Sequence, residues 1–229
     1  MFDELQRATS LKPAGGMPAA VLRDMDGTLV DTEPYWMAAE HALVAEFGGT
    51  WTDADGASLV GNPLLTSASI IRERGSVDLA DEVIVERLVE HVRRAVVQGV
   101  PWQPGARELL EELTAADIPC ALVTMSYIDL AEAVVSALPE GSFATLVTGD
   151  VVTYGKPHPE PYLMAAERLG VLPEDCIALE DSPPGLASAQ AAGCRVVGIP
   201  HMVPLQPGPG RVIVKSLAGM DLKTLASIA

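Results

Sequence analysis

Short runs of apolar residues alternate with amphipathic helical stretches along most of this chain. Strand-like runs cover residues 19–23, 121–123, 145–148, 177–179 and 195–199. The segments 104–116, 129–138, 159–169 and 184–192, which separate these runs, have the apolar spacing and the Pro and Gly boundaries of helices. Strands and helices in alternation predict an α/β fold with a Rossmann-like, doubly wound parallel sheet. An edge strand at 212–214 and a closing helix at 221–228 complete the predicted core.

Residues 35–100 interrupt this alternation with a purely helical pattern. Within it, five apolar residues fall on one stripe at helical spacing, with charged residues outside it: Val85, Leu88, Val89, Val92 and Val96. We therefore expect 35–100 to form a small helical domain, inserted into an α/β core made of 17–34 and 101–229. Residues 1–16 carry charges and lack the apolar stretch of a signal peptide, so we expect a flexible leader there.

The composition narrows the kind of partner. A formal net charge of −16 over 229 residues disfavours nucleic acids and anionic membranes, because both attract basic surfaces. No apolar run approaches the length that crosses a membrane. The cysteines, Cys120, Cys176 and Cys194, fit no zinc spacing, so we expect buried, reduced thiols in a cytoplasmic protein. The expected partner is a small molecule, and the chain is expected to be a monomer or a weak homodimer.

Two aspartates directly follow the first predicted strand. Asp24 and Asp26 are two residues apart, so in extended backbone their carboxylates point to the same side and can reach one ligand. Paired acids shift each other's pKa, which lets one act as an anion while the other donates a proton. Taken alone, the pair fits equally well a metal-binding pair without a covalent role, or two solvated aspartates in a turn.

Polar groups also follow three other strand-like segments. Thr124 offers a hydroxyl that either donates to a phosphate or caps the next turn. Lys156 either neutralises a phosphoryl group or is an ordinary surface lysine; the scarcity of cations in the chain favours the first. Glu180 and Asp181 end a buried apolar run, where two acids need a cation such as Mg²⁺, although Asp181 or Ser182 could also cap the next helix.

These segments carry a resemblance to a known family. The sequence from Asp24 to Glu33, DMDGTLVDTE, resembles the first motif of the haloacid dehalogenase superfamily. Thr124, Lys156 and the pair Glu180-Asp181 stand in the order of its three other motifs. The subgroup of β-phosphoglucomutase and many small phosphatases is the most similar, and the inserted helices resemble its helical cap.

The resemblance implies a role for each motif residue. Asp24 would attack phosphorus and form an aspartyl-phosphate, and Asp26 would act as general acid and then general base. Thr124 and Lys156 would hold the phosphoryl oxygens, and Ser126 would also bind substrate.

The resemblance also implies a metal ion and a shaped turn. Mg²⁺ would lie on Asp24, on the backbone carbonyl of Asp26 and on Asp181, with Glu180 acting through the ion's waters. Gly27 and Thr28 would give the turn its geometry and a backbone donor to the substrate.

Two positions depart from the family pattern. Residue 23 is Arg, where relatives usually carry an apolar aromatic residue, and such an arginine should reach solvent or find an acid. Mutases of this subgroup carry a Lys beside a cap glycine and an Arg three residues beyond it; if Gly61 is that glycine, Val60 and Leu64 stand there instead. Because a mutase must hold a bisphosphate at both ends, these uncharged residues favour hydrolysis.

The helical insertion should choose the substrate. Trp36 either faces the ligand or belongs to the core, and Asn62 either faces the ligand or caps a helix that begins at Pro63. Further candidates are Leu64, Leu65, His41 and Arg72. We expect this lining to be apolar and to suit a small monophosphate.

The leading hypothesis is a Mg²⁺-dependent phosphatase for a small phosphomonoester, preferably a sugar phosphate. The alternative within the family is a hexose-phosphate mutase. A phospho-aspartate signalling module is disfavoured by the acid at position 26 and by the inserted helices. Nothing in the sequence supports a catalytically silent binding protein, since every motif residue is present.

Overall fold

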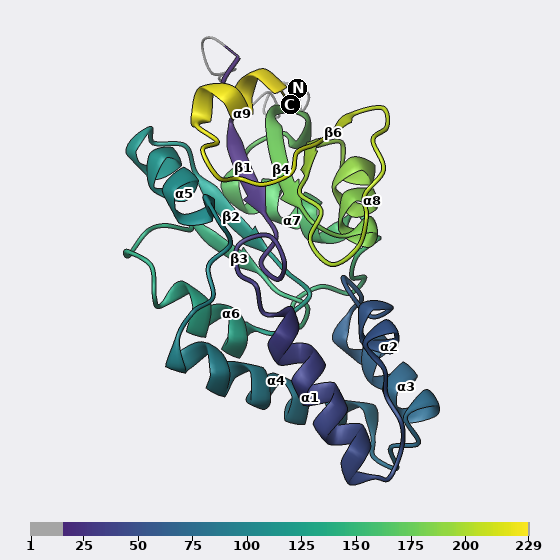
Figure 1. Ribbon diagram of the computed structural model, residues 1–229. Helices are drawn as coiled ribbons and strands as arrows, with labels where there is room; N and C mark the ends of the chain where they lie inside the picture. Colours follow the sequence, from purple (N-terminus) through teal and green to yellow (C-terminus); the bar gives the residue numbers. More distant parts are fainter. Residues whose placement is uncertain (1–15, 229) are drawn as a thin grey trace, which may run out of the picture.

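A six-stranded, all-parallel sheet forms the centre of the computed structural model, which describes residues 16–228. The strand order is β3-β2-β1-β4-β5-β6, so the chain starts in the middle, builds one side and then crosses to the other (Figure 1). This is the predicted doubly wound arrangement. The strands are β1 (Ala20–Arg23), β2 (Cys120–Val123), β3 (Thr145–Val147), β4 (Cys176–Glu180), β5 (Arg195–Gly198) and β6 (Arg211–Ile213).

Helices cover both faces of this sheet, because successive strand side chains point to opposite faces. Leu22 of β1 packs in the layer of α7 (Glu160–Leu169) and α8 (Pro183–Ala192). Val21 belongs to the other layer, which contains α5 (Ala106–Ala115), α6 (Ile128–Val135) and α9 (Leu222–Ile228). A short 3₁₀ helix, η1 (Pro173–Asp175), precedes β4. Both faces are buried, which explains why the strands are continuously apolar.

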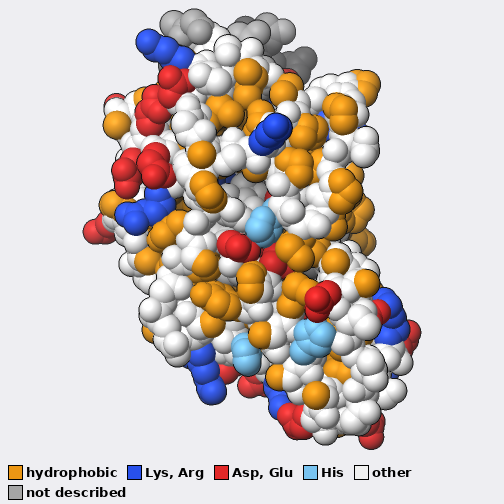
Figure 2. All heavy atoms as spheres, in the orientation of Figure 1, with side chains coloured by type: hydrophobic (Ala, Val, Ile, Leu, Met, Phe, Trp, Pro, Cys, Tyr) orange, Lys and Arg blue, Asp and Glu red, His pale blue; other side chains and the backbone are white. Residues whose placement is uncertain are grey.

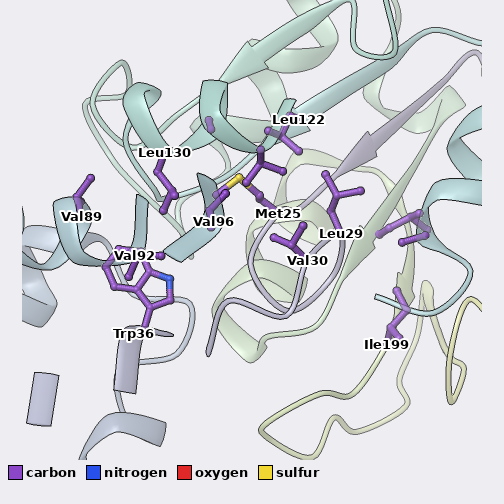
Figure 3. Packing of buried hydrophobic residues seen from close by; sticks show 14 of the residues in the cluster. Met25, Leu29, Val30, Trp36, Val89, Val92, Val96, Leu122, Leu130 and Ile199 are labelled. Carbon is purple, nitrogen blue, oxygen red and sulfur yellow. The ribbon is translucent and has the colours of Figure 1, made fainter. Parts of the chain in front are cut away.

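Four of the five helices between β1 and β2 lie beyond the ends of the strands, in the segment where the sequence predicts a helical insertion (Figure 1). They are α1 (Glu33–Glu46), α2 (Asp53–Ala57), α3 (Leu64–Arg74) and α4 (Asp81–Gln98). All five residues of the predicted apolar stripe on α4 are buried. Figure 3 shows Trp36 beside Val92, in the same cluster as Met25 and Leu29 from the loop after β1.

The observed element bounds agree with the predicted ones to within about three residues. The three cysteines are free and buried, as expected. No helix in the described part of the chain is long and apolar enough to cross a membrane. The predicted leader, apart from Gly16, lies outside the described residues, and the division at residues 34 and 101 into core and insertion stays a prediction.

Arg23 contradicts its expected environment, because it reaches neither solvent nor an acid. Its side chain is fully buried, and Nη1 donates to the backbone carbonyl of Ala106 at 2.7 Å. Nε and Nη2 have no hydrogen-bond partner among the described residues. The alternation of β1 directs Arg23 into the apolar layer under α5, and burial there lowers the pKa of Arg23 to about 10.

Candidate active site

The polar residues singled out in the sequence meet at the carboxyl ends of β1, β2 and β4. Asp24 follows β1, Thr124 follows β2, and Asp181 follows Glu180, the last residue of β4. β1 lies between β2 and β4, at the point where the strand order reverses. Open α/β sheets bind ligands at this point, because the loops on either side of it diverge and leave a crevice.

Lys156 ties two of these carboxylates together. Its Nζ donates to Oδ1 of Asp24 at 2.6 Å, to Oε1 of Glu180 at 2.6 Å and to the carbonyl of Val123 at 3.0 Å. Burial alone would lower its pKa, but the Asp24 and Glu180 carboxylates outweigh burial and raise the pKa of Lys156. The side chain is therefore a fixed cation beside Asp24.

Glu180 holds the Lys156 ammonium in place and is itself fixed by further hydrogen bonds. Tyr162 on α7 donates its hydroxyl to Oε1 of Glu180 at 2.7 Å. The other oxygen, Oε2, accepts from the backbone N–H of Asp181, and from the N–H and hydroxyl of Ser182. Glu180 is fully buried, so these bonds replace the water that the carboxylate loses on folding.

Asp26 is held by four donors. Thr32 and the Trp36 indole, at 3.2 Å, donate to its Oδ1, while Thr124 at 3.2 Å and Ser126 at 2.7 Å donate to its Oδ2. The donors come from the start of α1 and from the loop after β2, so Asp26 joins the helical insertion to the sheet. In this structure the hydroxyls of Thr124 and Ser126 are thus directed at Asp26.

Asp24, Glu180 and Asp181 form a set that fits a divalent cation. One carboxylate oxygen of each lies within 4.8 Å of the others. Oδ2 of Asp181 is buried and has no hydrogen-bond partner among the described residues. Clustered oxygen ligands of this kind suit Mg²⁺.

The raised pKa values of these carboxyls also indicate a cation site. Burial raises the pKa of the Asp24 carboxyl to about 7, although Lys156 opposes the shift and Glu180 adds to it. Burial, and next the negative charge of Asp24, hold the pKa of Asp181 well above its ordinary value. One lysine therefore does not neutralise the three acids, and a bound cation would lower both pKa values.

The turn after β1 places Asp181 and leaves little room around it. Gly27 has a φ of +83°, and a Cβ there would collide with the Asp181 carboxylate. The N–H of Gly27 donates to the carbonyl of Val30 at 2.8 Å, so it is engaged inside the turn. The geometric role predicted for Gly27 fits this structure, whereas its N–H is not free to donate to a substrate.

A cavity of about 70 Å³ opens over these residues. Most of the predicted site residues line it: Asp24, Asp26, Trp36, Asn62, Leu64, Thr124, Ser126, Lys156 and Asp181. Glu180 lies behind Lys156, and Gly27 lies within its turn. Trp36 was expected either to face the ligand or to belong to the core. It does belong to the core cluster, and it also lines the cavity. Asn62 makes no capping hydrogen bond to α3.

Three of the substrate-facing candidates lie away from the cavity. His41 contacts Asp53 at 3.1 Å and Arg72 contacts Asp81 at 2.7 Å, both at exposed positions. Leu65 is 45% exposed and points toward a separate hollow near α4 and α6.

Most of the residues that the helices after β1 contribute to the cavity are apolar, as expected, but α1 also contributes two acids that are not among the site residues predicted from the sequence. Glu33 and Glu40 lie on the same face of this helix as Trp36 and are buried to more than nine tenths. Burial raises the pKa of Glu33 to about 8 and that of Glu40 to about 6. Their spacing of three and four residues from Trp36 was a usable signal, although acidic residues are rarely buried and so suggest a solvated face.

A buried lysine thus holds the Asp24 carboxylate beside an acidic set at the switch point of a parallel sheet, where open α/β sheets bind their ligands. The chain belongs to the haloacid dehalogenase-like hydrolase family, whose model matches residues 21–199. The resemblance in the sequence is thereby confirmed, and the protein is a phosphomonoester hydrolase.

Several characterised proteins are similar over most of the chain. A phosphorylated carbohydrates phosphatase from Thermotoga maritima is 34% identical over 184 residues, which cover 80% of this chain and 85% of that protein. Hexitol phosphatase A from Escherichia coli is 34% identical over 188 residues, covering 78% and 81%. The crystal structure of CbbY from Rhodobacter sphaeroides with xylulose-(1,5)bisphosphate has a TM-score of 0.82 and 27% identity, covering 91% of this chain and 99% of that one.

Proposed function

We propose that this protein is a Mg²⁺-dependent phosphatase that hydrolyses a sugar phosphate through an aspartyl-phosphate on Asp24. The observation that carries the proposal is the position of the Asp24 carboxylate. Lys156 fixes its Oδ1 at 2.6 Å at the floor of a cavity, and the carboxylates of Asp181 and Glu180 lie close to it, Asp181 also lining the cavity. A carboxylate so restrained is placed to attack a phosphorus atom that enters from the cavity.

The first step forms one bond and breaks one. An oxygen of Asp24 bonds to phosphorus while the ester bond to the sugar oxygen breaks, and Asp26 gives that oxygen a proton. In the second step water attacks phosphorus, Asp26 takes its proton, and phosphate leaves Asp24. Thr124 and Ser126 support this sequence, because their hydroxyls can turn from Asp26 to the oxygens of an incoming phosphoryl group.

Asp24 and Asp181 would hold the Mg²⁺, with Glu180 close to it. When bound, the ion supplies positive charge that offsets the charge of these acids and of the phosphoryl group. Lys156 supplies the other positive charge on the floor of the site and keeps Asp24 oriented.

Hydrolysis is favoured over a mutase reaction by the charge of the cavity wall. Lys156 is the only cationic residue among the described residues that line the cavity. If Gly61 is the cap glycine of the mutases, Val60 and Leu64 stand where a mutase would carry cations. A sugar bisphosphate would therefore find a partner for only one of its phosphates. The phosphatase names of the two relatives from T. maritima and E. coli support a phosphorylated carbohydrate as the substrate.

The test is ³¹P NMR of the protein with Mg²⁺ and a panel of small phosphate esters, including β-glucose 1-phosphate. The proposal predicts growth of the inorganic phosphate signal, which stops when EDTA removes the metal. Conversion of β-glucose 1-phosphate to glucose 6-phosphate without phosphate release would contradict hydrolysis and indicate a mutase.

A further inference from the structure

Three residues on one face of α1 form a wall above the catalytic floor. Glu33, Trp36 and Glu40 are spaced by three and four residues, so they lie above one another along the helix. All three line the cavity and are less than 9% exposed. Glu33 is close enough to Asp26 and Asp24 for their charges to affect it. Glu40 lies two turns further on, about 10 Å along the axis.

Glu40 is fixed in place but not neutralised. The Trp51 indole donates to its Oε2 at 2.9 Å, and a Cβ on Gly56 would lie 2.9 Å from that same oxygen. Its other oxygen, Oε1, has no hydrogen-bond donor within residues 16–228. Arg74 lies over the Trp51 ring at 5.7 Å and pairs with Asp55, so it makes no ion pair with Glu40.

Glu33 is also without a partner. Glu33 is 8% exposed, lines the cavity and makes no hydrogen bond with a described residue. Carboxyl oxygens that line a cavity with few protein donors can gain hydrogen bonds from a ligand that brings donors of its own. The hydroxyls of a polyol are donors of this kind, and both carboxyl groups can accept from them.

Glu40 would instead repel a ligand group that carries a negative charge. The cavity holds no lysine, arginine or histidine from the described part of the insertion, so a second phosphate or a carboxylate would face Glu40 with nothing to neutralise it. A hydroxymethyl group at the same position would instead donate a hydrogen bond to Glu40.

We propose that Glu40, with Glu33, makes this site specific for the monophosphate of a neutral polyol, and excludes esters whose far end carries a second anion. The proposal rests on the proposed phosphatase function for its kinetic test. It names the class of leaving group: an uncharged, polyhydroxylated carbon chain.

The test compares two six-carbon esters that share a phosphate on carbon 6. D-Glucitol 6-phosphate ends in a hydroxymethyl group and 6-phosphogluconate ends in a carboxylate. At pH 7.5 with Mg²⁺, we expect kcat/KM of the wild type to favour glucitol 6-phosphate roughly 100-fold. Glu40→Gln, which keeps an oxygen for Trp51, should reduce that ratio at least tenfold, mainly by improving the reaction of 6-phosphogluconate.

Glu46→Gln is the matched control, since Glu46 is on the same helix but exposed and paired with Arg87. It should leave the ratio unchanged. Equal kcat/KM for both esters in the wild type, or the same ratio in Glu40→Gln as in the wild type, would overturn the proposal.

A binding experiment separates this proposal from the phosphatase reaction. Titration calorimetry of Asp24→Asn, with and without Glu40→Gln, measures the affinities for both esters in the presence of Mg²⁺ and needs no turnover. Preference for glucitol 6-phosphate that depends on Glu40 supports the proposal even if no phosphate is released by the wild type. Equal affinities in both backgrounds would overturn it whatever the activity.

Discussion

Arg23 is a charged residue in a place where the sheet needs an apolar one. Its guanidinium is buried, has one hydrogen bond to Ala106 and lacks an acid partner. Replacing a buried ion pair by well-packed apolar side chains is often neutral or stabilising by about 1–4 kcal/mol, and the Arg23 guanidinium lacks even an acid to offset its loss of water. We therefore expect Arg23→Met to raise the free energy of unfolding, measured by urea denaturation. Arg94→Met, at an exposed position on α4, should change it by no more than about 0.5 kcal/mol. A less stable Arg23→Met would contradict this view of Arg23.

Glu40 makes a pH-dependent contribution to stability. Burial raises its pKa from 4.5 to about 6, although the Trp51 N–H and His41 oppose the shift. The folded protein therefore resists ionisation of Glu40, and the cost develops as pH rises from about 4.5 to about 6. Glu40→Gln removes the cost, so it should gain about 2 kcal/mol over the wild type above pH 6.5.

The measurement is urea unfolding of both proteins between pH 4 and pH 8. Below pH 4.5 the two should be equally stable, because Glu40 is then neutral in both the folded and the unfolded state. A stability difference that does not vary with pH would show that Glu40 is not perturbed in this way.

At the scale of an element, the turn between β1 and α1 sets the position of Asp181. Gly27 has a positive φ and also lies against the Asp181 carboxylate. Gly27→Ala should therefore weaken Mg²⁺ binding at least tenfold by titration calorimetry, and should lower the free energy of unfolding by more than the roughly 1 kcal/mol of backbone strain.

Gly48→Ala provides the control for backbone strain. Gly48 has a φ of +74°, but nothing lies within 4 Å of the position its Cβ would take. This variant should lose stability and keep its Mg²⁺ affinity. Equal Mg²⁺ affinity in both variants would contradict the role given to the turn.

The elements themselves were largely predictable from the sequence. Periodicity gave the sheet strands, the helices between them and the buried stripe of α4, because both faces of the sheet and one face of α4 are apolar. Asp24, Thr124 and Asp181 of the cavity floor were predictable because each directly follows a strand, whereas Lys156 lies nine residues after the end of β3. The cavity wall was not predictable, since Glu33 and Glu40 break the rule that buried positions are apolar. Arg23 breaks the same rule within a strand.

At the scale of the whole molecule, charge opposes self-association. The net charge is −16, and on the face shown in Figure 2 acidic and basic side chains of the described residues are dispersed, without a broad basic patch. Copies of such a chain repel one another at low salt. We expect a mass near 24.1 kDa in sedimentation equilibrium at low salt. A stable species of twice that mass would contradict the prediction of a monomer or weak homodimer.

The most direct test of the covalent reaction is phosphate release by Asp24→Asn. Asn keeps the shape of Asp24 but cannot supply the carboxylate nucleophile, so with Mg²⁺ and glucitol 6-phosphate we expect the rate to fall by at least about 1,000-fold. Circular dichroism should show that the variant is folded. Release within tenfold of the wild-type rate by the folded variant would contradict attack by Asp24, and with it the aspartyl-phosphate intermediate.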